Sequence, residues 1–207
     1  MKKFFHDYSY SVVKMFVDQF AIAIFGTSLT LATTHSHGTS TEFDSFTLIV
    51  SICSAIFYLV LLYTLTWEIG AKDRVSVDSG RKPYRPHLGL LLSLLANIPN
   101  LILAILYALA TLFQTLSVFA AESMVQMKFV VRFIASLLQG MYFGTITTVA
   151  LPIGDQWVLL NSWWPTYFLM VVPALITCWI AYYLGYKNFR FIKPKQPQAP
   201  TERPNMK

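Results

Sequence analysis

The sequence predicts an all-α fold: a polytopic integral membrane helical bundle with four full spans and one interfacial or re-entrant outer helix. Two observations predict it. First, 55% of the 207 residues are hydrophobic and only 13% are charged, whereas a soluble domain carries roughly 25% charged residues. Second, fourteen of the sixteen Lys and Arg residues lie in three segments that long apolar runs separate. Because Lys and Arg resist translocation, these basic segments are expected on the cytoplasmic side of the plasma membrane.

Five apolar runs are candidates to cross a hydrocarbon core of about 30 Å, which takes about 20 residues of helix. Four of them are predicted to cross completely, at residues 15–34, 46–67, 88–113 and 163–185. The first run follows a long charged leader, and Asp18 and Gln19 interrupt its start. We therefore expect an uncleaved first helix and not a signal peptide.

The remaining run, residues 120–152, is predicted to lie in the interface or to dip partway into the membrane from the outer side. Its first half is amphipathic, because Lys128 and Arg132 recur at helical spacing among apolar residues. Basic segments at both ends of the chain also require an even number of crossings. The alternative is five transmembrane helices with an outside tail, since residues 133–152 carry no charge.

Residues 1–185 are expected to form a single transmembrane domain, and residues 186–207 a disordered, basic, cytoplasmic tail that is rich in proline. The connection from Glu68 to His87 is the longest one on the cytoplasmic side. Several residues in it favour turns and exclude one continuous helix: Gly70, Gly80, Pro83 and Pro86.

Basic side chains of this connection are candidate contacts for anionic lipid headgroups or for a protein partner. They are Lys72, Arg74, Arg81, Lys82 and Arg85. Internal salt bridges within a positive-inside loop explain them equally well. On the outer side, Arg132 is a candidate for the same kind of contact. It could also hold Glu122 or Asp155, or extend along the apolar surface to reach water.

The third span contains the candidate intramembrane polar site, formed by Asn97, Pro99 and Asn100. Proline removes a backbone donor and clashes with the preceding turn, so the helix should kink near Leu95 and Ala96. The two amides could bind a substrate or an ion, as broken helices of transporters do. They could instead join neighbouring helices around the kink, which is the interpretation the residues favour.

Gly140 and Gly144 lie four residues apart, a spacing that allows close helix packing. We predict no metal and no cofactor. An outer loop contains two histidines and two carboxylates, but it offers no defined geometry for a metal: His35, His37, Glu42 and Asp44. Both cysteines, Cys53 and Cys178, lie in apolar runs. A net charge of +6 is explained by lipid-facing loops, so nucleic acid is not an expected partner.

No catalytic motif occurs, and all four histidines lie outside the apolar runs. The sequence therefore predicts a protein that is not an enzyme. The leading hypothesis is a subunit or accessory component of a membrane complex, with a protein partner or as a homo-oligomer. The alternative is a small transport or ligand-binding component that uses the kinked third helix. A membrane enzyme is the third hypothesis, and its acids would come from a short set: Asp18, Glu68, Asp73 and Asp78.

Overall fold

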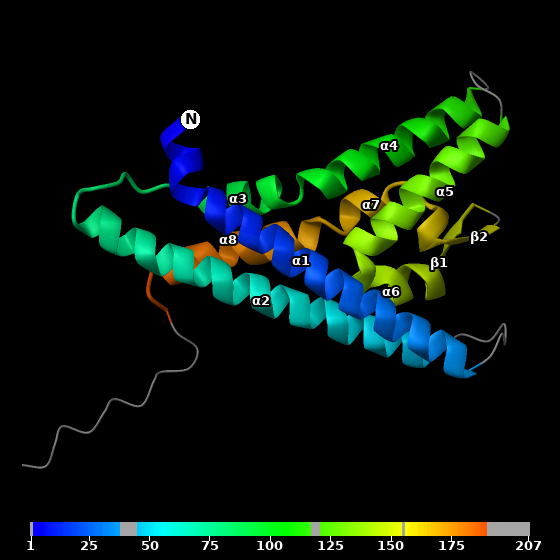
Figure 1. The fold of residues 1–207 in the computed structure, drawn as a ribbon, viewed down its shortest axis with the longest axis horizontal. Coiled ribbons are helices and arrows are strands. Elements are labelled where there is room, and N and C mark those ends of the chain that lie inside the picture. The colour runs from blue at the N-terminus through cyan, green and yellow to red at the C-terminus, as the bar shows by residue number, and fades with distance from the viewer. Residues whose placement is uncertain (1, 38–44, 117–120, 155, 190–207) are drawn as a thin grey trace, which may run out of the picture.

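The computed structural model describes residues 2–37, 45–116, 121–154 and 156–189. Most of them are helical (Figure 1). The α-helices are α1 (Lys2–His37), α2 (Ser45–Asp78), α3 (Leu88–Ala96), α4 (Ile98–Thr115), α5 (Ala121–Leu138), α6 (Phe143–Thr148), α7 (Thr166–Leu169) and α8 (Val172–Tyr186). Two 3-10 turns, η1 (Gly140–Tyr142) and η2 (Leu160–Ser162), and one hairpin of β1 (Ala150–Ile153) and β2 (Gln156–Leu159) complete the described chain.

The predicted all-α membrane bundle is confirmed. Four stretches are long and apolar enough to cross a membrane: Asp7–Thr33, Ser45–Asp78, Ile98–Thr115 and Thr166–Tyr186. Their outward faces carry large apolar side chains, which suits contact with lipid.

Both ends of the described chain lie at the same end of the bundle (Figure 1). Tyr8, near the start of α1, and Tyr182, near the end of α8, both hydrogen-bond to Asp73, near the end of α2. The connection of residues 79–87 lies here too, with its basic residues, so we call this the basic end. An even number of complete crossings follows, as the charge distribution predicts.

The chain leaves and re-enters the bundle at the opposite, far end. Thr115, which ends α4, and Trp164, just before α7, line the same groove, and the rings of Tyr107 and Tyr167 lie 4.7 Å apart. Between them, residues 122–138 and 140–148 form a helix pair bent by 94°. This pair enters and returns from the far end, which is the geometry of a re-entrant element and not of a fifth crossing.

Two helices are longer than the predicted spans. Helix α1 begins at Lys2, and α2 continues past residue 67 to Asp78. Gly70, predicted to mark a turn, lies inside α2, so that prediction was wrong. A Cβ at Gly70 would overlap the backbone carbonyl of Tyr182, and the missing side chain lets α8 approach. Gly80 does form a turn, with φ +72°.

The third span breaks where the kink was predicted. Helix α3 ends at Ala96, α4 begins at Ile98, and only Asn97 separates them. Pro99 lies at the second position of α4, where it lacks the donor that a continuous helix needs. The last span is also interrupted, between α7 and α8, just before Pro173.

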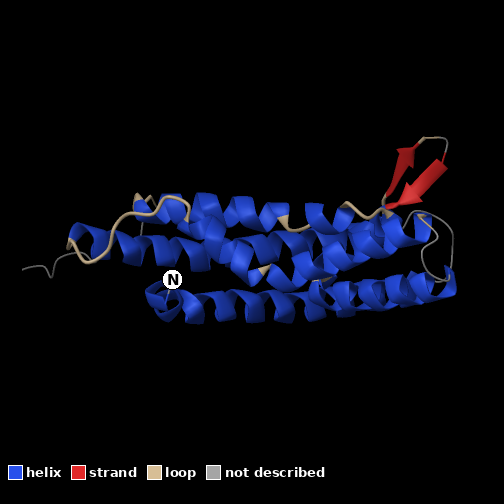
Figure 2. Ribbon diagram, turned by 90° about the horizontal axis from the view of Figure 1, so that it is seen from above, coloured by secondary structure: helices blue, strands red, loops and turns tan. Residues whose placement is uncertain are grey.

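The hairpin was not predicted. Ala150 pairs with Leu159 and Ile153 with Gln156, in antiparallel register. Gly154 adopts φ +63° in the two-residue loop, which is the glycine-containing turn that a short hairpin favours. The hairpin stands out sideways from the helices near the far end (Figure 2), so it adds a small feature to an all-α bundle.

Helix α8 ends in a tight cap. Asn188 adopts φ +54°, and the backbone N–H of Phe189 donates to the carbonyl of Leu184 at 3.0 Å, as in a Schellman motif. Residues 190–207, most of the predicted disordered tail, lie outside the described residues.

Candidate functional site

The break in the third span is held by its own asparagines. The Asn97 Nδ2 donates to the carbonyl of Ser93 at 2.9 Å, and the Asn100 Nδ2 donates to Asn97 Oδ1 at 2.9 Å. Both side chains are buried. Asn97 therefore links the end of α3 to the first turn of α4 across the break, and the predicted role of joining neighbouring helices stays a prediction. Asn100 Oδ1 has no hydrogen-bond partner among the described residues.

The re-entrant element reaches its deepest point at residues 139–142, which we call the tip. Gly140 packs against α1, where a Cβ would overlap the Thr27 hydroxyl and the Ala23 carbonyl. Gly26 of α1 faces the tip in return, since a Cβ there would lie 2.8 Å from the Cα of Met141. Missing side chains on both sides thus let the tip enter the bundle beside α1.

Helix α2 anchors the tip through one hydroxyl. The Ser51 Oγ donates to the carbonyl of Met141 at 2.9 Å and accepts a hydrogen bond from the backbone N–H of Thr145 at 3.0 Å. Gly144 lies against the same helix, where a Cβ would be 2.7 Å from the Thr47 carbonyl. The two glycines predicted to mediate packing therefore contact two different helices.

The tip and the break belong to one core. Its buried members include Met15 and Ile22 of α1, Tyr58 of α2, Ala96 of α3 and Met141 of the tip. Gln19 lies between Met15 and Ile22 along the chain and is itself buried. Tyr142 packs against this core. Side chains from four separate segments therefore meet here.

Buried polar atoms remain without partners at this meeting point. Four of them have no hydrogen-bond partner within the described ranges: Gln19 Oε1, Asn100 Oδ1, Gln139 Oε1 and Tyr142 OH. We call the residues that carry these atoms, together with Asn97, the polar centre. Unsatisfied polar groups cost several kcal/mol in a hydrocarbon-like setting. Each such group requires an explanation, such as an ordered water or a bound ion.

Arg132 is not part of the polar centre. Its Nη2 donates to the Tyr107 hydroxyl at 2.7 Å, a partner that the sequence did not suggest. Of the two carboxylates considered for it, Glu122 is exposed and Asp155 lies outside the described residues. Lys128 bonds to Gln114 Oε1 at 2.9 Å nearby, so this cluster ties α5 to α4 near the far end.

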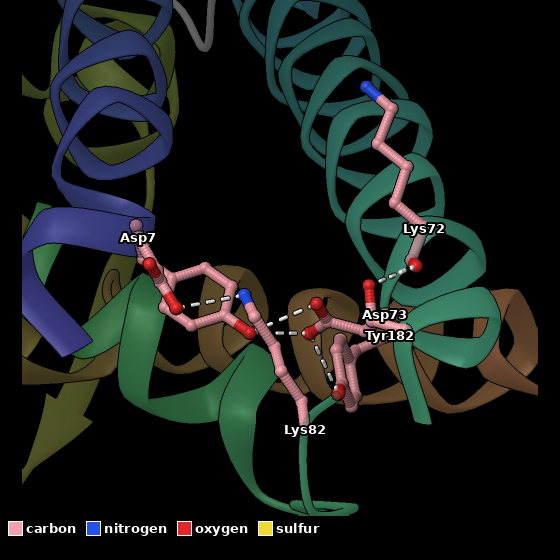
Figure 3. A network of polar contacts seen from close by, with 7 residues as sticks. Asp7, Lys72, Asp73, Lys82 and Tyr182 are labelled. Carbon is pink, nitrogen blue, oxygen red and sulfur yellow. Dashed lines mark hydrogen bonds and ion pairs between the residues drawn. The ribbon is translucent and has the colours of Figure 1, made fainter. Parts of the chain in front are cut away.

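A second polar cluster occupies the basic end (Figure 3). The Tyr8 hydroxyl lies 3.0 and 2.8 Å from the two carboxylate oxygens of Asp73, and the Tyr182 hydroxyl donates to the second oxygen at 3.2 Å. Lys82 Nζ lies 2.9 Å from Asp7 Oδ2. Three helices and the connection are therefore joined at one place.

The burial of Asp73 was missed at the sequence level, although a signal exists. Buried residues of α2 recur every three or four positions: Thr47, Ser51, Ser54, Tyr58, Leu62, Thr66, Gly70 and Asp73. Continuing this period beyond Trp67 would have placed Gly70 and Asp73 on the buried face.

The predicted lipid or partner contacts divide into two groups. Lys72 pairs with Glu68 at 3.8 Å and Arg74 with Asp78 at 3.5 Å, both on the exposed face of α2. Arg81, Lys82 and Arg85 instead line a cavity at the basic end.

In the part of the chain that the structure describes, no group of three or more His, Cys, Asp or Glu side chains could hold a metal. The side chains of His35 and His37 are outside this part, as are Glu42 and Asp44. Both cysteines are free; Cys178 is buried, but Cys53 is exposed on the bundle surface. Comparisons with protein families, curated proteins and solved structures find no match to this chain.

Proposed function

We propose that this protein is a small, non-enzymatic component of the plasma membrane that binds a monovalent cation or a small neutral polar solute at the polar centre. The supporting observation is that the re-entrant tip and the end of α3 share one core, and that four buried polar atoms of the tip, α1 and the start of α4 lack partners among the described residues. Irregular backbone at membrane depth is tolerated where it lines a site, and transporters place such breaks around their substrates.

The chemistry of the centre limits the ligand. Its unpartnered atoms are amide and hydroxyl oxygens, and none of its residues carries a formal charge. Neutral oxygens can replace part of the hydration shell of a monovalent cation and can bond to a neutral solute. A multiply charged anion would meet acceptors without a compensating positive charge.

Flux through reconstituted liposomes tests this function. Sodium, potassium and proton entry would be followed with entrapped fluorescent indicators, and urea and glycerol entry by light scattering. We expect at least one to enter faster than into empty liposomes, and we expect Gln139→Leu to abolish that difference. The control is Gln126→Leu, the same substitution at an exposed position of α5. Equal flux for Gln139→Leu and the wild-type protein, or no flux above empty liposomes, would contradict the proposal.

We also propose that both termini lie in the cytoplasm. The charge distribution supports it, and the basic end gathers the start of α1, the connection and the end of α8. A reporter that works only in the cytoplasm, fused to the C-terminus, should be active. If an impermeant reagent added outside intact cells labels the cysteine of an Arg85→Cys variant, the orientation is the reverse of the proposed one.

A second candidate function is that of an accessory subunit, which docks a protein partner or a second copy of this chain. It is favoured by the extension of α2 past Trp67, which displays Lys72 and Arg74 on a rigid helix. Purification in a mild detergent should then yield a complex. A monodisperse monomer without associated protein would argue against this candidate.

A further inference from the structure

A cavity of about 100 Å³ lies at the basic end. Its walls come from α1, α2, α8, the first residue of α3 and the connection of residues 79–87. Five charged side chains line it: Asp7, Asp73, Arg81, Lys82 and Arg85.

Three of these charged groups already have partners. Lys82 is paired with Asp7 and lies 4.7 Å from the centre of the Tyr8 ring. Both carboxylate oxygens of Asp73 accept hydrogen bonds from tyrosine hydroxyls. Both carboxylates that line the cavity therefore have partners within the protein.

The two arginines are different. Within the described ranges, the guanidinium groups of Arg81 and Arg85 form no hydrogen bond or ion pair. Arg74, by contrast, pairs with Asp78 on its own helix. A guanidinium group can donate two parallel hydrogen bonds to the oxygens of a phosphate group, and two unpaired ones line this cavity.

Aromatic side chains typical of a membrane–water interface lie at the same end of the bundle as the cavity. Leu88 and Val77 form apolar parts of its wall, and the rings of Tyr84 and Tyr186 lie 4.2 Å apart at the same end. The Trp67 indole donates to the carbonyl of Phe189 at 2.9 Å. Tyrosine and tryptophan typically mark the boundary between hydrocarbon and water.

We infer that this cavity binds a phosphate group through Arg81 and Arg85. The phosphate would come from the headgroup of an anionic phospholipid or from free phosphate. The inference deepens the sequence-level prediction of lipid contacts, and it rests on the proposed cytoplasmic orientation only for the leaflet that supplies the lipid. It does not depend on the polar centre.

The test measures lipid binding by the purified full-length protein in detergent, using native mass spectrometry. The probes are phosphatidic acid, phosphatidylcholine and inorganic phosphate. We expect phosphatidic acid to bind more tightly than phosphatidylcholine, and the double variant Arg81→Gln/Arg85→Gln to lose this preference. Because each charge-assisted contact is worth about tenfold in affinity, a loss of about tenfold per arginine is expected.

The control is Lys72→Gln/Arg74→Gln, which removes the same net charge from side chains that are paired on the exposed face of α2. It should keep the preference. Competition by inorganic phosphate would identify a site for free phosphate as well, whereas its failure to compete would assign the site to the lipid.

Equal losses in both double variants would mean general charge attraction and would overturn the inference. So would the absence of any preference in the wild-type protein, a result that does not depend on whether a variant folds. Flux through the polar centre should be the same in the Arg81→Gln/Arg85→Gln protein, so the two proposals fail separately.

Discussion

The Asp73 cluster of the basic end and the polar centre both contain buried polar side chains, but they differ in how completely these are partnered. In the first, the oxygens of Asp73 accept hydrogen bonds from two tyrosine hydroxyls, and Lys82 nearby is paired with Asp7. In the polar centre, Asn100 and Gln139 keep oxygens without partners in the described chain. A satisfied network rigidifies a fold, whereas an unpaired buried polar group is costly. The comparison therefore predicts a larger contribution to stability from the Asp73 cluster than from the unpartnered oxygens of the polar centre.

The largest expected effect is at Asp73. Asp73→Ala removes the carboxylate that accepts the hydrogen bonds of the Tyr8 and Tyr182 hydroxyls, and each hydrogen bond to a charged group contributes about 1.5–3 kcal/mol. We expect the free energy of unfolding to fall by about 3–5 kcal/mol, measured by denaturant titration in mixed micelles. Asp78→Ala, at an exposed carboxylate of the same helix, should cost less than about 1 kcal/mol. Equal effects would show that the tyrosine cluster does not stabilise the bundle.

A smaller loss is expected at the glycine beside this cluster. Gly70→Val places a side chain against the backbone of Tyr182, and such overpacking typically costs about 1–3 kcal/mol. The same titration would measure it. Val75→Leu, at an exposed position of α2, should change stability by less than about 0.5 kcal/mol. If Gly70→Val is equally harmless, α8 does not approach α2 as closely as the structure indicates.

The smallest expected effects on stability are those of substitutions in the polar centre, where Asn97 at the break is compared with Gln139 at the tip. Asn97→Leu removes its bonds to Ser93 and Asn100, and neutral hydrogen bonds contribute about 0.5–1.5 kcal/mol each. We expect a loss of about 1–2 kcal/mol. Gln139→Leu removes a buried oxygen that has no partner in the described part of the chain, so the free energy of unfolding of this variant should be nearly unchanged. A strongly destabilised Gln139→Leu protein would make the tip structural and weaken the comparison.

Much of the architecture could be predicted from local composition. The four spans, the amphipathic start of the re-entrant element and the break near Ala96 follow from hydropathy, charge and one proline. The length of α2 could not, because Gly70 and Gly80 look alike in the sequence. One lies against the backbone of α8 and the other ends the helix at φ +72°, and only the neighbouring helix decides between them.

The candidate sites show the same division. Asn97, Pro99 and Asn100 were predicted as a polar site, but the other residues of the polar centre, Gln19, Gln139 and Tyr142, come from segments far away in the chain. Nothing local to Gln139 predicts that it is buried. Asp73 was recognised only as an acid of a cytoplasmic connection, although its helical spacing from Gly70 would have placed it inside.

By itself, the sequence determined how the chain is threaded: apolar runs prefer the hydrocarbon core, and basic segments resist crossing it. Each segment has these preferences independently of the others, so they can be predicted from its own composition. Tertiary structure alone decided which polar groups found partners, because a hydrogen bond needs two groups at the right distance. The oxygens of Asp73 found partners on two other helices, whereas those of Asn100 and Gln139 found none among the described residues.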